Sequence, residues 1–251
     1  ILHFYNKTKN KKYLDVVEKL LLSLSSKGIY DHLEGGISRY TVDEKWIVPH
    51  FEKMLYDNIQ YVNLLNNYLS NKENNYLKLK LIQTIKFINS EFIVKNNLLG
   101  SAYDADSDGV EGKYYVWKYQ ELKDILGNDL ESFKKKYQIS EQGNFEGSNI
   151  LIENLGSNIS TDSKILEIEQ KLLEIRKKRN KPFFDDKSQT DLNAFWVYTN
   201  LYSSIILNDK ILFDKSIKNF ENLNQIYQNK LFHCYNDNKQ IDVFLEDYVY
   251  F

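Results

Sequence analysis

Hydrophobic residues recur at helical spacing along most of this chain, and that period constrains the fold more than any other feature of the sequence. In the stretch 11–27, for example, apolar side chains share one face, and Gly28 follows as a typical C-terminal cap residue. Corresponding stripes predict further helices over these ranges: 49–69, 74–94, 119–126, 129–137, 161–178, 191–207 and 210–229. The 191–207 stretch is apolar nearly all round, so that helix is expected to be buried.

The connections between these helices are of two kinds. The links at 70–74 and 208–209 are short and polar. Four connections are long and rich in polar and aromatic residues: 35–50, 101–117, 181–187 and 232–248. If outer and inner helices alternate, every long connection leads into an inner helix, and all of them emerge at one end. We therefore predict an all-α fold, a partial α/α toroid with short β segments in its loops, including a strand at 113–117. The region 119–153 interrupts the alternation.

The two ends of the chain bear on its domain organisation. The chain begins at Ile1 rather than at methionine and ends within the apolar run VFLEDYVYF. A complete ring of six hairpins needs twelve helices, whereas the stripes predict about seven or eight. We therefore expect a single toroid domain over 1–251, as a fragment cut at both ends.

Charge and composition argue against several kinds of partner. The formal net charge is −2, so no basic field favours nucleic acid or an anionic membrane. No apolar run approaches the roughly 20 residues that a bilayer span needs. The single cysteine, Cys234, cannot form an internal disulfide and favours a reducing compartment, so we expect a cytoplasmic protein that binds neither nucleic acid nor membranes.

Five motifs, taken in order, resemble one known family. They are GGISRYTVDEKWIVPHFEKMLYDN, SAYDADSDGVEGKYYVW, ISEQGNFEGSNIL, RKKRNKPFFDDKSQT and FLEDY, and they extend from about Gly28 to Tyr248. Together they are similar to the α-helical part of the YyaL-like, spermatogenesis-associated thioredoxin-domain proteins.

The resemblance implies a six-hairpin glycosidase-like fold, close in shape to the N-acylglucosamine and cellobiose 2-epimerases. It also implies a linked N-terminal thioredoxin-like domain, whose paired cysteines are absent from this chain. Two positions depart from the family pattern. Ser38 stands where the family usually has His, and Leu192 to Ala194 stand where it usually has Trp-Asn-Gly. These departures put the standard activity of the family in question for this chain.

Three ionisable residues on the predicted helix 49–69 are candidates for catalysis. His50 and Asp57 fall on one face, and Glu52 lies in the first turn, where the helix dipole stabilises a carboxylate. The same dipole disfavours an imidazolium, so His50 is expected to stay neutral and to act as a general base. The alternative is that all three residues cap the helix and bind loop backbone.

The loop before this helix supplies candidates for substrate binding, namely Arg39, Tyr40 and Trp46. Arg39 either clamps a carboxylate or a sugar hydroxyl, or pairs with Asp43 or Glu44 to hold the loop. Aromatic faces stack on the C–H faces of sugars, although such rings equally well fill a core.

The second long connection contains three aspartates, Asp104, Asp106 and Asp108, which with Gly109 spell the opening of a calcium loop. Such a loop needs Glu at its twelfth position, where this chain has Tyr115, so no metal or other cofactor is predicted. Asp104 and Asp106 are instead candidates for catalytic carboxylates, because sugar hydrolysis uses two that flank the scissile bond. Asp108 is better explained as a turn residue.

Further candidates lie in the third and fourth long connections. Asp186 is a catalytic candidate, and either it or Asp185 is expected to cap the helix that follows. His233 is a second possible histidine base. The remaining residues assigned to substrate binding are Tyr103, Asp185, Lys187, Asn193 and Asp247.

Two classes of function stay open. The first is a carbohydrate-active enzyme acting on a small saccharide or glycan, either an epimerase with His50 as base or a glycosidase with two carboxylates. The second is a non-catalytic binding or scaffold module that serves the linked thioredoxin-like domain. The departures at Ser38 and Leu192 favour the second class.

Overall fold

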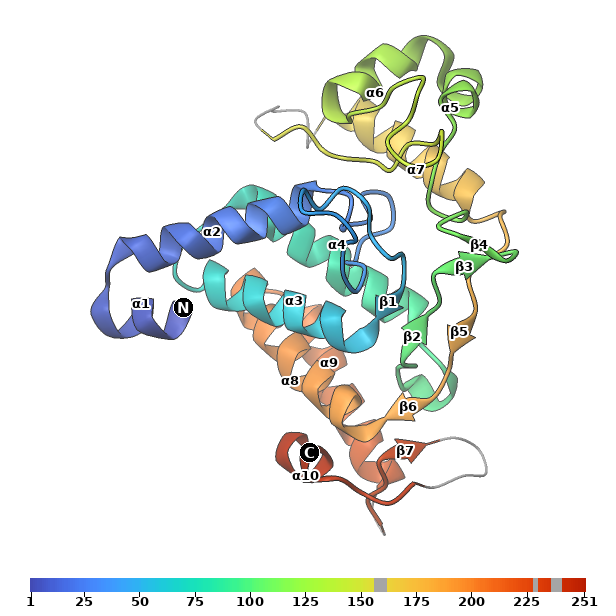
Figure 1. The fold of residues 1–251 in the computed structure, drawn as a ribbon. Coiled ribbons are helices and arrows are strands. Elements are labelled where there is room, and N and C mark those ends of the chain that lie inside the picture. Colours follow the sequence, from blue (N-terminus) through green and yellow to red (C-terminus); the bar gives the residue numbers. More distant parts are fainter. Residues whose placement is uncertain (156–161, 228–229, 236–240) are drawn as a thin grey trace. The chain divides into compact units, whose positions relative to one another are not determined.

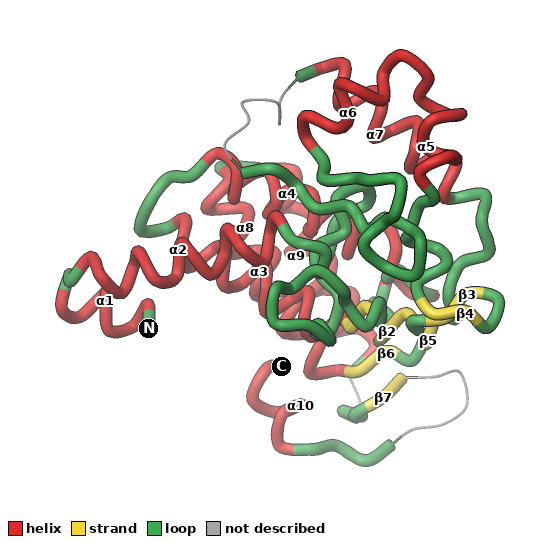
Figure 2. Tube along the Cα trace, turned by 45° about the horizontal axis from the view of Figure 1, so that its top comes forward, coloured by secondary structure: helices red, strands yellow, loops and turns green. Residues whose placement is uncertain are grey.

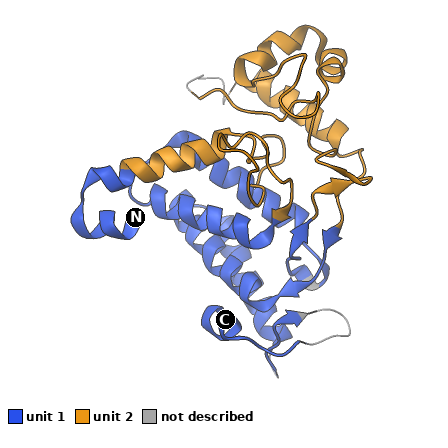
Figure 3. Ribbon diagram, in the orientation of Figure 1, with its two compact units in different colours: residues 1–14, 54–103, 184–251 blue, residues 15–53, 104–183 orange. Residues whose placement is uncertain are grey.

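A computed structural model describes residues 1–155, 162–227, 230–235 and 241–251. The chain divides into two compact units (Figure 3). Unit 1 comprises 1–14, 54–103 and 184–251, and unit 2 comprises 15–53 and 104–183. Each unit is described by itself below. Among the described residues, no helix is long and apolar enough to cross a membrane.

Unit 1 is built from helical hairpins (Figure 1). Its helices are α1 (Leu2–Thr8), α3 (Leu55–Leu69), α4 (Asn75–Glu91), α8 (Thr190–Leu207), α9 (Lys210–Ile226) and α10 (Leu245–Tyr250), with a 3-10 turn at Lys95–Asn97. α2 (Lys11–Ser26) begins in this unit and continues into the other. Apart from α1 and α10, each helix lies where an apolar stripe predicts one.

The hairpins of unit 1 are arranged as the alternating connections predict. α3 packs against α4 across the short link that follows it, and α8 packs in the same way against α9. α8 also packs against both α3 and α10, so the helices that follow long connections are neighbours of one another (Figures 1 and 2). The predicted all-α fold, with hairpins packed as in a partial α/α toroid, is therefore confirmed.

Short strands precede the helices that follow long connections (Figure 2). β2 (Ala102–Tyr103) pairs antiparallel with β5 (Phe184–Asp185), and β6 (Ser188–Gln189) pairs antiparallel with β7 (Cys234–Tyr235). β1 (Lys53–Met54) leads directly into α3, and β6 leads directly into α8. Because β6 runs straight into α8, its pairing with β7 fixes the start of that helix beside the segment 230–235.

Apart from Ala194 and Trp196, the buried side chains of α8 are small and polar, and other apolar side chains of the helix are exposed, which corrects the expectation that an all-round apolar surface buries it. Tyr198 and Ile205 are 57% and 67% exposed. On the covered face, Asn66 of α3 donates from Nδ2 to the Thr199 carbonyl at 3.1 Å and to Ser203 Oγ at 2.8 Å. Small side chains let helices approach closely, and each buried polar group then needs a hydrogen-bond partner.

Unit 2 combines three helices with a tight hairpin. Its elements are α5 (Tyr119–Leu126), a 3-10 turn at Gly127–Asp129, α6 (Leu130–Lys136), α7 (Ser163–Arg176), β3 (Asp106–Ser107) and β4 (Val110–Glu111). Trp117, Phe133 and Leu172, all fully buried, lie in its main hydrophobic core. The three helices lie where they are predicted. Asp162 caps α7 by accepting the Lys164 N–H at 2.9 Å.

The strand predicted at 113–117 is wrong for most of its length. The chain turns at 112–115, and within the predicted range the pairing is that of Trp117 in an isolated bridge with Asn149. The neighbouring strand pairing falls earlier, between β3 and β4. The reversal between these strands uses Asp108 and Gly109, with φ angles of 53° and 71°. Glycine adopts this left-handed region freely, and aspartate adopts it more readily than most residues. The interpretation of Asp108 as a turn residue agrees with this geometry.

The helix predicted from Pro49 begins only at Leu55. His50 and Glu52 therefore lie before the helix, and the argument that its dipole acts on them is wrong. Phe51, between them, has a φ of 56°, which an α-helix does not accommodate.

The extended segment that replaces this first helical turn pairs with the loop ahead of it. The His50 N–H donates to the Tyr40 carbonyl at 3.0 Å, and the Arg39 N–H donates to the Glu52 carbonyl at 2.9 Å. These long-range bonds satisfy backbone groups that a helix would otherwise use, so tertiary pairing overrides the helical pattern here.

Four charged side chains are buried together in unit 2: Asp31, Glu34, Lys53 and Arg176. Arg176 donates from both terminal nitrogens to the Asp31 carboxylate, at 2.9 and 2.8 Å, and Lys53 Nζ lies 2.6 Å from it. Glu34 lies 3.2 Å from Arg176. Burial alone would raise the pKa of Asp31. The charges and hydrogen bonds of Arg176 and Lys53 outweigh this effect and hold that pKa well below its ordinary value.

Replacing Asp31 should therefore destabilise the protein strongly. Asp31→Asn leaves two buried cations short of a partner, and we expect a loss of about 3–5 kcal/mol in the free energy of unfolding at pH 7. Since the pKa of Asp31 is lowered on folding, its contribution is complete above the unfolded value of about 3.9 and is lost as pH falls below it. Urea unfolding from pH 7 to pH 2.5 should show the difference between wild type and variant shrinking below about pH 4.

Asp108→Asn is the matched control, because it removes an exposed carboxylate that lies 2.9 Å from Lys113 in the same unit. This change should leave the unfolding midpoint nearly unchanged. Equal losses for the two variants would contradict a structural role for the buried network.

Candidate functional site

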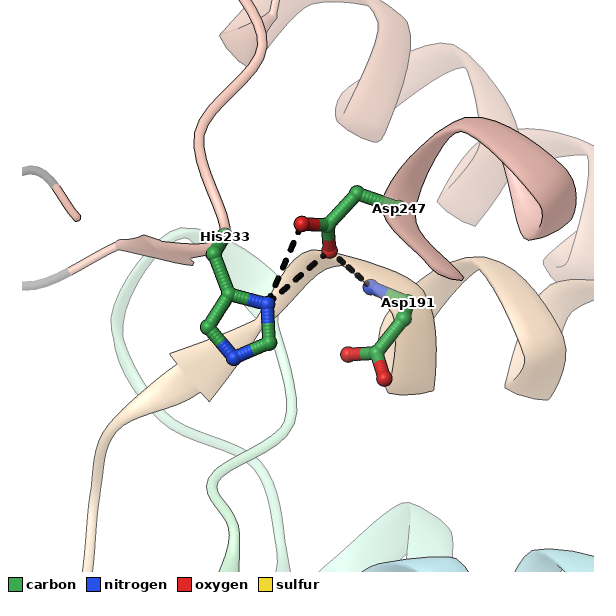
Figure 4. A group of neighbouring side chains, drawn as sticks. All are labelled: Asp191, His233 and Asp247. Carbon is green, nitrogen blue, oxygen red and sulfur yellow. Dashed lines mark hydrogen bonds and ion pairs between the residues drawn. The ribbon is translucent and has the colours of Figure 1, made fainter. Parts of the chain in front are cut away.

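A fully buried carboxylate, Asp247, stands in the first turn of α10. It caps that helix by accepting the Phe244 N–H at 2.8 Å, and it accepts the N–H of Asp191, at the start of α8, at 3.2 Å. His233, just before β7, directs its Nδ1 at the same carboxylate and lies 3.1 Å from each oxygen (Figure 4). Asp247 therefore joins three segments that are distant in the sequence.

The second ring nitrogen of His233 faces Gln189. The Gln189 carboxamide nitrogen lies 3.3 Å from His233 Nε2, and the imidazole packs edge-on against Phe244 with centroids 4.6 Å apart. When Nδ1–H donates to Asp247, Nε2 accepts from Gln189 and the imidazole is neutral. A buried carboxylate on Nδ1 fixes this tautomer and leaves the lone pair on Nε2, which is the arrangement that a general base needs.

Asp191 is the third member of this group. One ligand-capable atom from each of Asp191, His233 and Asp247 lies within 4.8 Å of the others. In Figure 4 the Asp191 carboxyl turns away from Asp247, toward the side of the imidazole. Asp191 Oδ1 is buried and has no hydrogen-bond partner in the part of the chain that the structure describes. Burial raises the pKa of Asp191, and the charge of Asp247 adds to this, while the Leu192 N–H and His233 oppose it.

A group of two carboxylates and an imidazole can either bind a metal ion or act as an acid–base pair. The contacts of Asp247 favour the acid–base pair. The Asp247 oxygens already accept N–H groups from Phe244, Asp191 and His233. A metal ion would thus compete with these donors and find only two ready ligands, fewer than the three or four protein ligands of typical sites. A carboxyl whose pKa is raised by burial, beside an imidazole, can instead give and take protons.

Asn193, assigned to substrate binding from the sequence, holds backbone next to this group. Its Oδ1 accepts the Leu99 N–H at 2.8 Å, and its Nδ2 donates to the carbonyls of Leu99 and Gln189, at 3.1 and 2.8 Å. Asn193 thereby fixes the residue that contacts His233. A direct role in substrate binding stays a prediction.

The aspartates that precede α8 do not cap it, so that expectation is wrong. The N-cap residue is Gln189, whose side chain makes no capping bond. Asp185 instead accepts the Lys187 N–H at 3.2 Å, and its carboxylate lies 3.1 Å from Lys187 Nζ. Asp186 is exposed. The β6 strand lies between these residues and the helix, so the N-cap position falls on Gln189.

Tyr103 and Asp57, two further candidates in unit 1, lie in β2 and α3. Tyr103 donates from its hydroxyl to the Glu91 carbonyl at 2.7 Å and stacks on Phe184 with centroids 4.6 Å apart. Because α3 begins at Leu55 and not at Pro49, Asp57 lies in its first turn, the place predicted for Glu52, where a carboxylate is stabilised by the helix dipole. The roles proposed for them in catalysis and binding stay predictions.

In unit 2 the structure brings four predicted residues together: Arg39, Tyr40, His50 and Glu52. Tyr40 stacks on His50 with centroids 4.8 Å apart, and Arg39 pairs with Glu52 at 3.2 Å. His50 Nδ1 lies 2.9 Å from Glu111, and its Nε2 lies 3.8 Å from Glu52. The expected pairing of Arg39 with Asp43 or Glu44 is therefore replaced by one with Glu52. These side chains are 24–46% exposed, so water and salt screen the charges.

The other candidates of unit 2 are loop residues. Asp104 is exposed, and its Oδ1 accepts the N–H of Ala105 at 2.7 Å. Asp106 is exposed in β3, and Trp46 is half-buried with a φ of 60°. A catalytic role for either aspartate, like a shared cavity for the candidates of both units, stays a prediction.

Sequence reasoning missed two members of the strongest group. The sequence pattern predicts Asp191 only as the start of a helix and does not single out Gln189. A signal was present, because Asp191 is a charged residue at the beginning of a helix predicted to be buried, where an acidic side chain needs a reason.

The structure thus defines a helical-hairpin protein with an acid–base group at the start of one helix, and known proteins with similar sequences exist. Spermatogenesis-associated protein 20 of human is 26% identical over 213 residues, and the mouse protein is 27% identical over the same length. An uncharacterised protein of Caenorhabditis elegans is 33% identical over 128 residues. These matches confirm the resemblance stated from the motifs.

The matched regions are parts of longer proteins. The alignment with human spermatogenesis-associated protein 20 covers 70% of this chain and 27% of that protein, and the worm alignment covers 48% and 18%. No protein-family model matches the chain.

Solved structures with partial likeness include two sugar enzymes. A sugar epimerase from a ruminal bacterium aligns over 96% of this chain and 62% of its own, at 12% identity and a TM-score of 0.39. A D-mannose isomerase aligns over 93% and 59%, at 12% identity and a TM-score of 0.36.

The free-energy penalty of burying an ionised Asp191 can be measured from the stability of the protein. Its pKa is raised on folding, so its ionised form opposes folding above the folded pKa, and this penalty disappears below the unfolded value of about 3.9. Asp191→Asn should therefore increase the free energy of unfolding at pH 8 and not at pH 3.5, as measured by urea unfolding. Asp185→Asn, which removes the partner of Lys187, should show no gain at pH 8. A loss of stability for Asp191→Asn at pH 8 would show that Asp191 is a structural carboxylate.

Proposed function

We propose that this chain carries the acid–base site of a carbohydrate-active enzyme that moves a proton beside the carbonyl group of an open-chain sugar, as an aldose–ketose isomerase or a 2-epimerase does. The observation that carries the proposal is His233, whose Nδ1 faces the buried Asp247 carboxylate, beside the Asp191 carboxyl, whose pKa is raised by burial. The sugar as substrate class follows from the family resemblance of the sequence motifs.

The reaction needs one base and one acid on the same face of the substrate. His233 Nε2 takes the proton from the carbon next to the carbonyl, while protonated Asp191 donates its proton to the carbonyl oxygen. The intermediate is a neutral enediol, and the new imidazolium is stabilised by Asp247, as a buried carboxylate stabilises a catalytic histidine in acyl-transfer enzymes. Proton numbers balance, because the group loses one proton from Asp191 and gains one on His233.

The second half of the reaction decides the product. If His233 returns its proton to the former carbonyl carbon and Asp191 recovers a proton from the hydroxyl on the neighbouring carbon, an aldose becomes a ketose. Return of a proton to the original carbon from the opposite face would give the 2-epimer and would need a second proton donor there. No electrons are gained or lost by the sugar overall. The single His233 base therefore favours the isomerase over the epimerase.

Glycoside hydrolysis fits this group less well. That reaction needs two carboxyl groups, about 5 to 9.5 Å apart, that can both reach the substrate. Asp247 is fully buried and accepts three N–H groups, so it does not meet that need. Gln189 lies against His233 Nε2, and a sugar would take its place there, leaving the carboxamide to bind a sugar hydroxyl.

The alternative of a non-catalytic binding or scaffold module is supported by the loop candidates. Asp104 bonds the backbone of its own loop, and His50 is engaged by Glu111, so neither presents an unoccupied catalytic group. The acid–base group of unit 1 is the reason to prefer the enzyme.

Proton exchange tests the proposal without knowledge of the product. NMR in D₂O should show the protein catalysing loss of the C2 proton signal of one or more aldoses from a panel of hexoses and pentoses. His233→Asn should lower this rate by about 10²–10⁴, the contribution of a general base. Asp247→Asn should also lower it, because the imidazole loses the partner that fixes its tautomer.

His50→Ala provides the comparison, since it removes the histidine favoured by the sequence motifs and lies in the other unit. Under this proposal His50→Ala keeps the wild-type exchange rate. If His50→Ala abolishes exchange and His233→Asn does not, the base is His50. If wild type exchanges no sugar of the panel, the isomerase proposal fails and the binding module is favoured.

A further inference from the structure

A cavity in unit 1 lies along α4 and α9, and its lining does not include the residues of the acid–base group. Its volume is about 340 Å³, which falls in the range of small-molecule sites, roughly 300–1,000 Å³. It is bordered by the last turns of α4, by the segment around the 3-10 turn, and by α9. Leu99 and Ile93 supply apolar lining.

Carboxamides dominate the polar lining of this cavity. Five of its lining residues are amides: Asn89, Asn97, Asn219, Asn222 and Gln225. Each carboxamide offers both donors and an acceptor. A surface of this kind matches the hydroxyl groups of a polyol, which also donate and accept.

The charged lining of the cavity favours an anion. It consists of Lys215, Lys218 and Glu221, which together carry one net positive charge. Neither lysine makes an ion pair within the described part of the chain, although Lys215 is half-buried. Burial lowers the pKa of Lys215, as expected for an ammonium group that lacks a nearby counter-ion. An anionic group placed here would supply that counter-ion.

We propose that this cavity is a binding site for a small anionic polyol, a sugar bearing a phosphate or a carboxylate, with Lys215 and Lys218 on the anion and the carboxamides on the hydroxyl groups. The site is separate from the acid–base group, and its occupation does not require that the chain be an isomerase.

Hydrogen bonds of Asn193 connect the cavity wall to the acid–base group. Leu99, in the cavity wall, exchanges two backbone hydrogen bonds with the Asn193 carboxamide, at 2.8 and 3.1 Å. Asn193 in turn holds the carbonyl of Gln189, whose side chain contacts His233. A ligand that orders the segment around Leu99 would therefore also affect the position of Gln189, which contacts His233 Nε2.

Calorimetric titration with four probes tests the site: glucose 6-phosphate, gluconate, glucose and inorganic phosphate. The protein should bind glucose 6-phosphate or gluconate saturably and more tightly than either glucose or phosphate. Tighter binding of glucose 6-phosphate would identify a phosphate as the anionic group of the ligand, and tighter binding of gluconate would identify a carboxylate. The double variant Lys215→Met, Lys218→Met should weaken this binding roughly ten- to hundredfold, as expected when charged hydrogen-bond donors are lost.

Two further variants keep the test independent of folding. Lys210→Met removes one positive charge from α9, half the change of the double variant, at a side chain that is 86% exposed and does not line the cavity, and it should leave affinity unchanged. Asn219→Leu keeps both lysines and should weaken binding of the sugar ligand while sparing inorganic phosphate. Each variant is accepted only if its melting temperature stays near that of wild type.

Three results would overturn the proposal. They are binding of glucose as tight as that of both anionic sugars, an equal loss of affinity in Lys210→Met, and phosphate binding as tight as that of glucose 6-phosphate. Failure of sugar exchange at the acid–base group would leave this binding intact, so the two proposals fail separately.

Discussion

Buried charge that must be matched by donors is the constraint on which both units depend. In unit 2, Asp31 receives two bonds from Arg176 and one from Lys53, which ties the 28–53 loop to the end of α7. In unit 1, Asp247 receives N–H groups from Phe244, Asp191 and His233, which ties α10, α8 and the segment before β7 together. A buried carboxylate without such partners is costly, so each of them specifies a loop arrangement that apolar packing alone leaves open.

The helices could be predicted from the sequence, because a helix shows in the local spacing of apolar residues. The residue at which a helix begins could not be predicted in this way. α3 has the stripe of an amphipathic helix from Pro49 onward, yet it begins at Leu55 because the preceding backbone pairs with the 39–42 loop. Gly28 shows the same limit. It follows α2 as a cap residue would, but a side chain there would meet the Ile47 carbonyl oxygen at 1.9 Å. Both outcomes are set by contacts between segments, which periodicity does not contain.

The sequence predicted the types of residue in the candidate site, namely histidine and aspartate. It identified only some of the individual residues. Asp247 and His233 could be named because they lie in a long connection rich in polar residues. Asp191 was harder to name, since at the start of a helix an aspartate has an ordinary explanation in the dipole, and the predicted burial of that helix was the available signal. Its buried Oδ1, which has no hydrogen-bond partner among the described residues, becomes evident only once β6, β7 and α10 are in place around it. His50 drew attention through its motif, but its surroundings are an exposed ion network.

Asp31 and Asp191 are carboxylates whose pKa values are shifted in opposite directions. Asp31 is buried more completely, and matching donors lower its pKa, so its charge contributes to stability. Asp191 is less buried, yet burial raises its pKa, and the nearby charge of Asp247 adds to this effect. One of its carboxylate oxygens has no hydrogen-bond partner among the described residues. Selection for stability alone would supply Asp191 with a donor or replace it with an amide. A carboxyl kept at a cost beside an oriented imidazole is therefore better explained by chemistry than by folding.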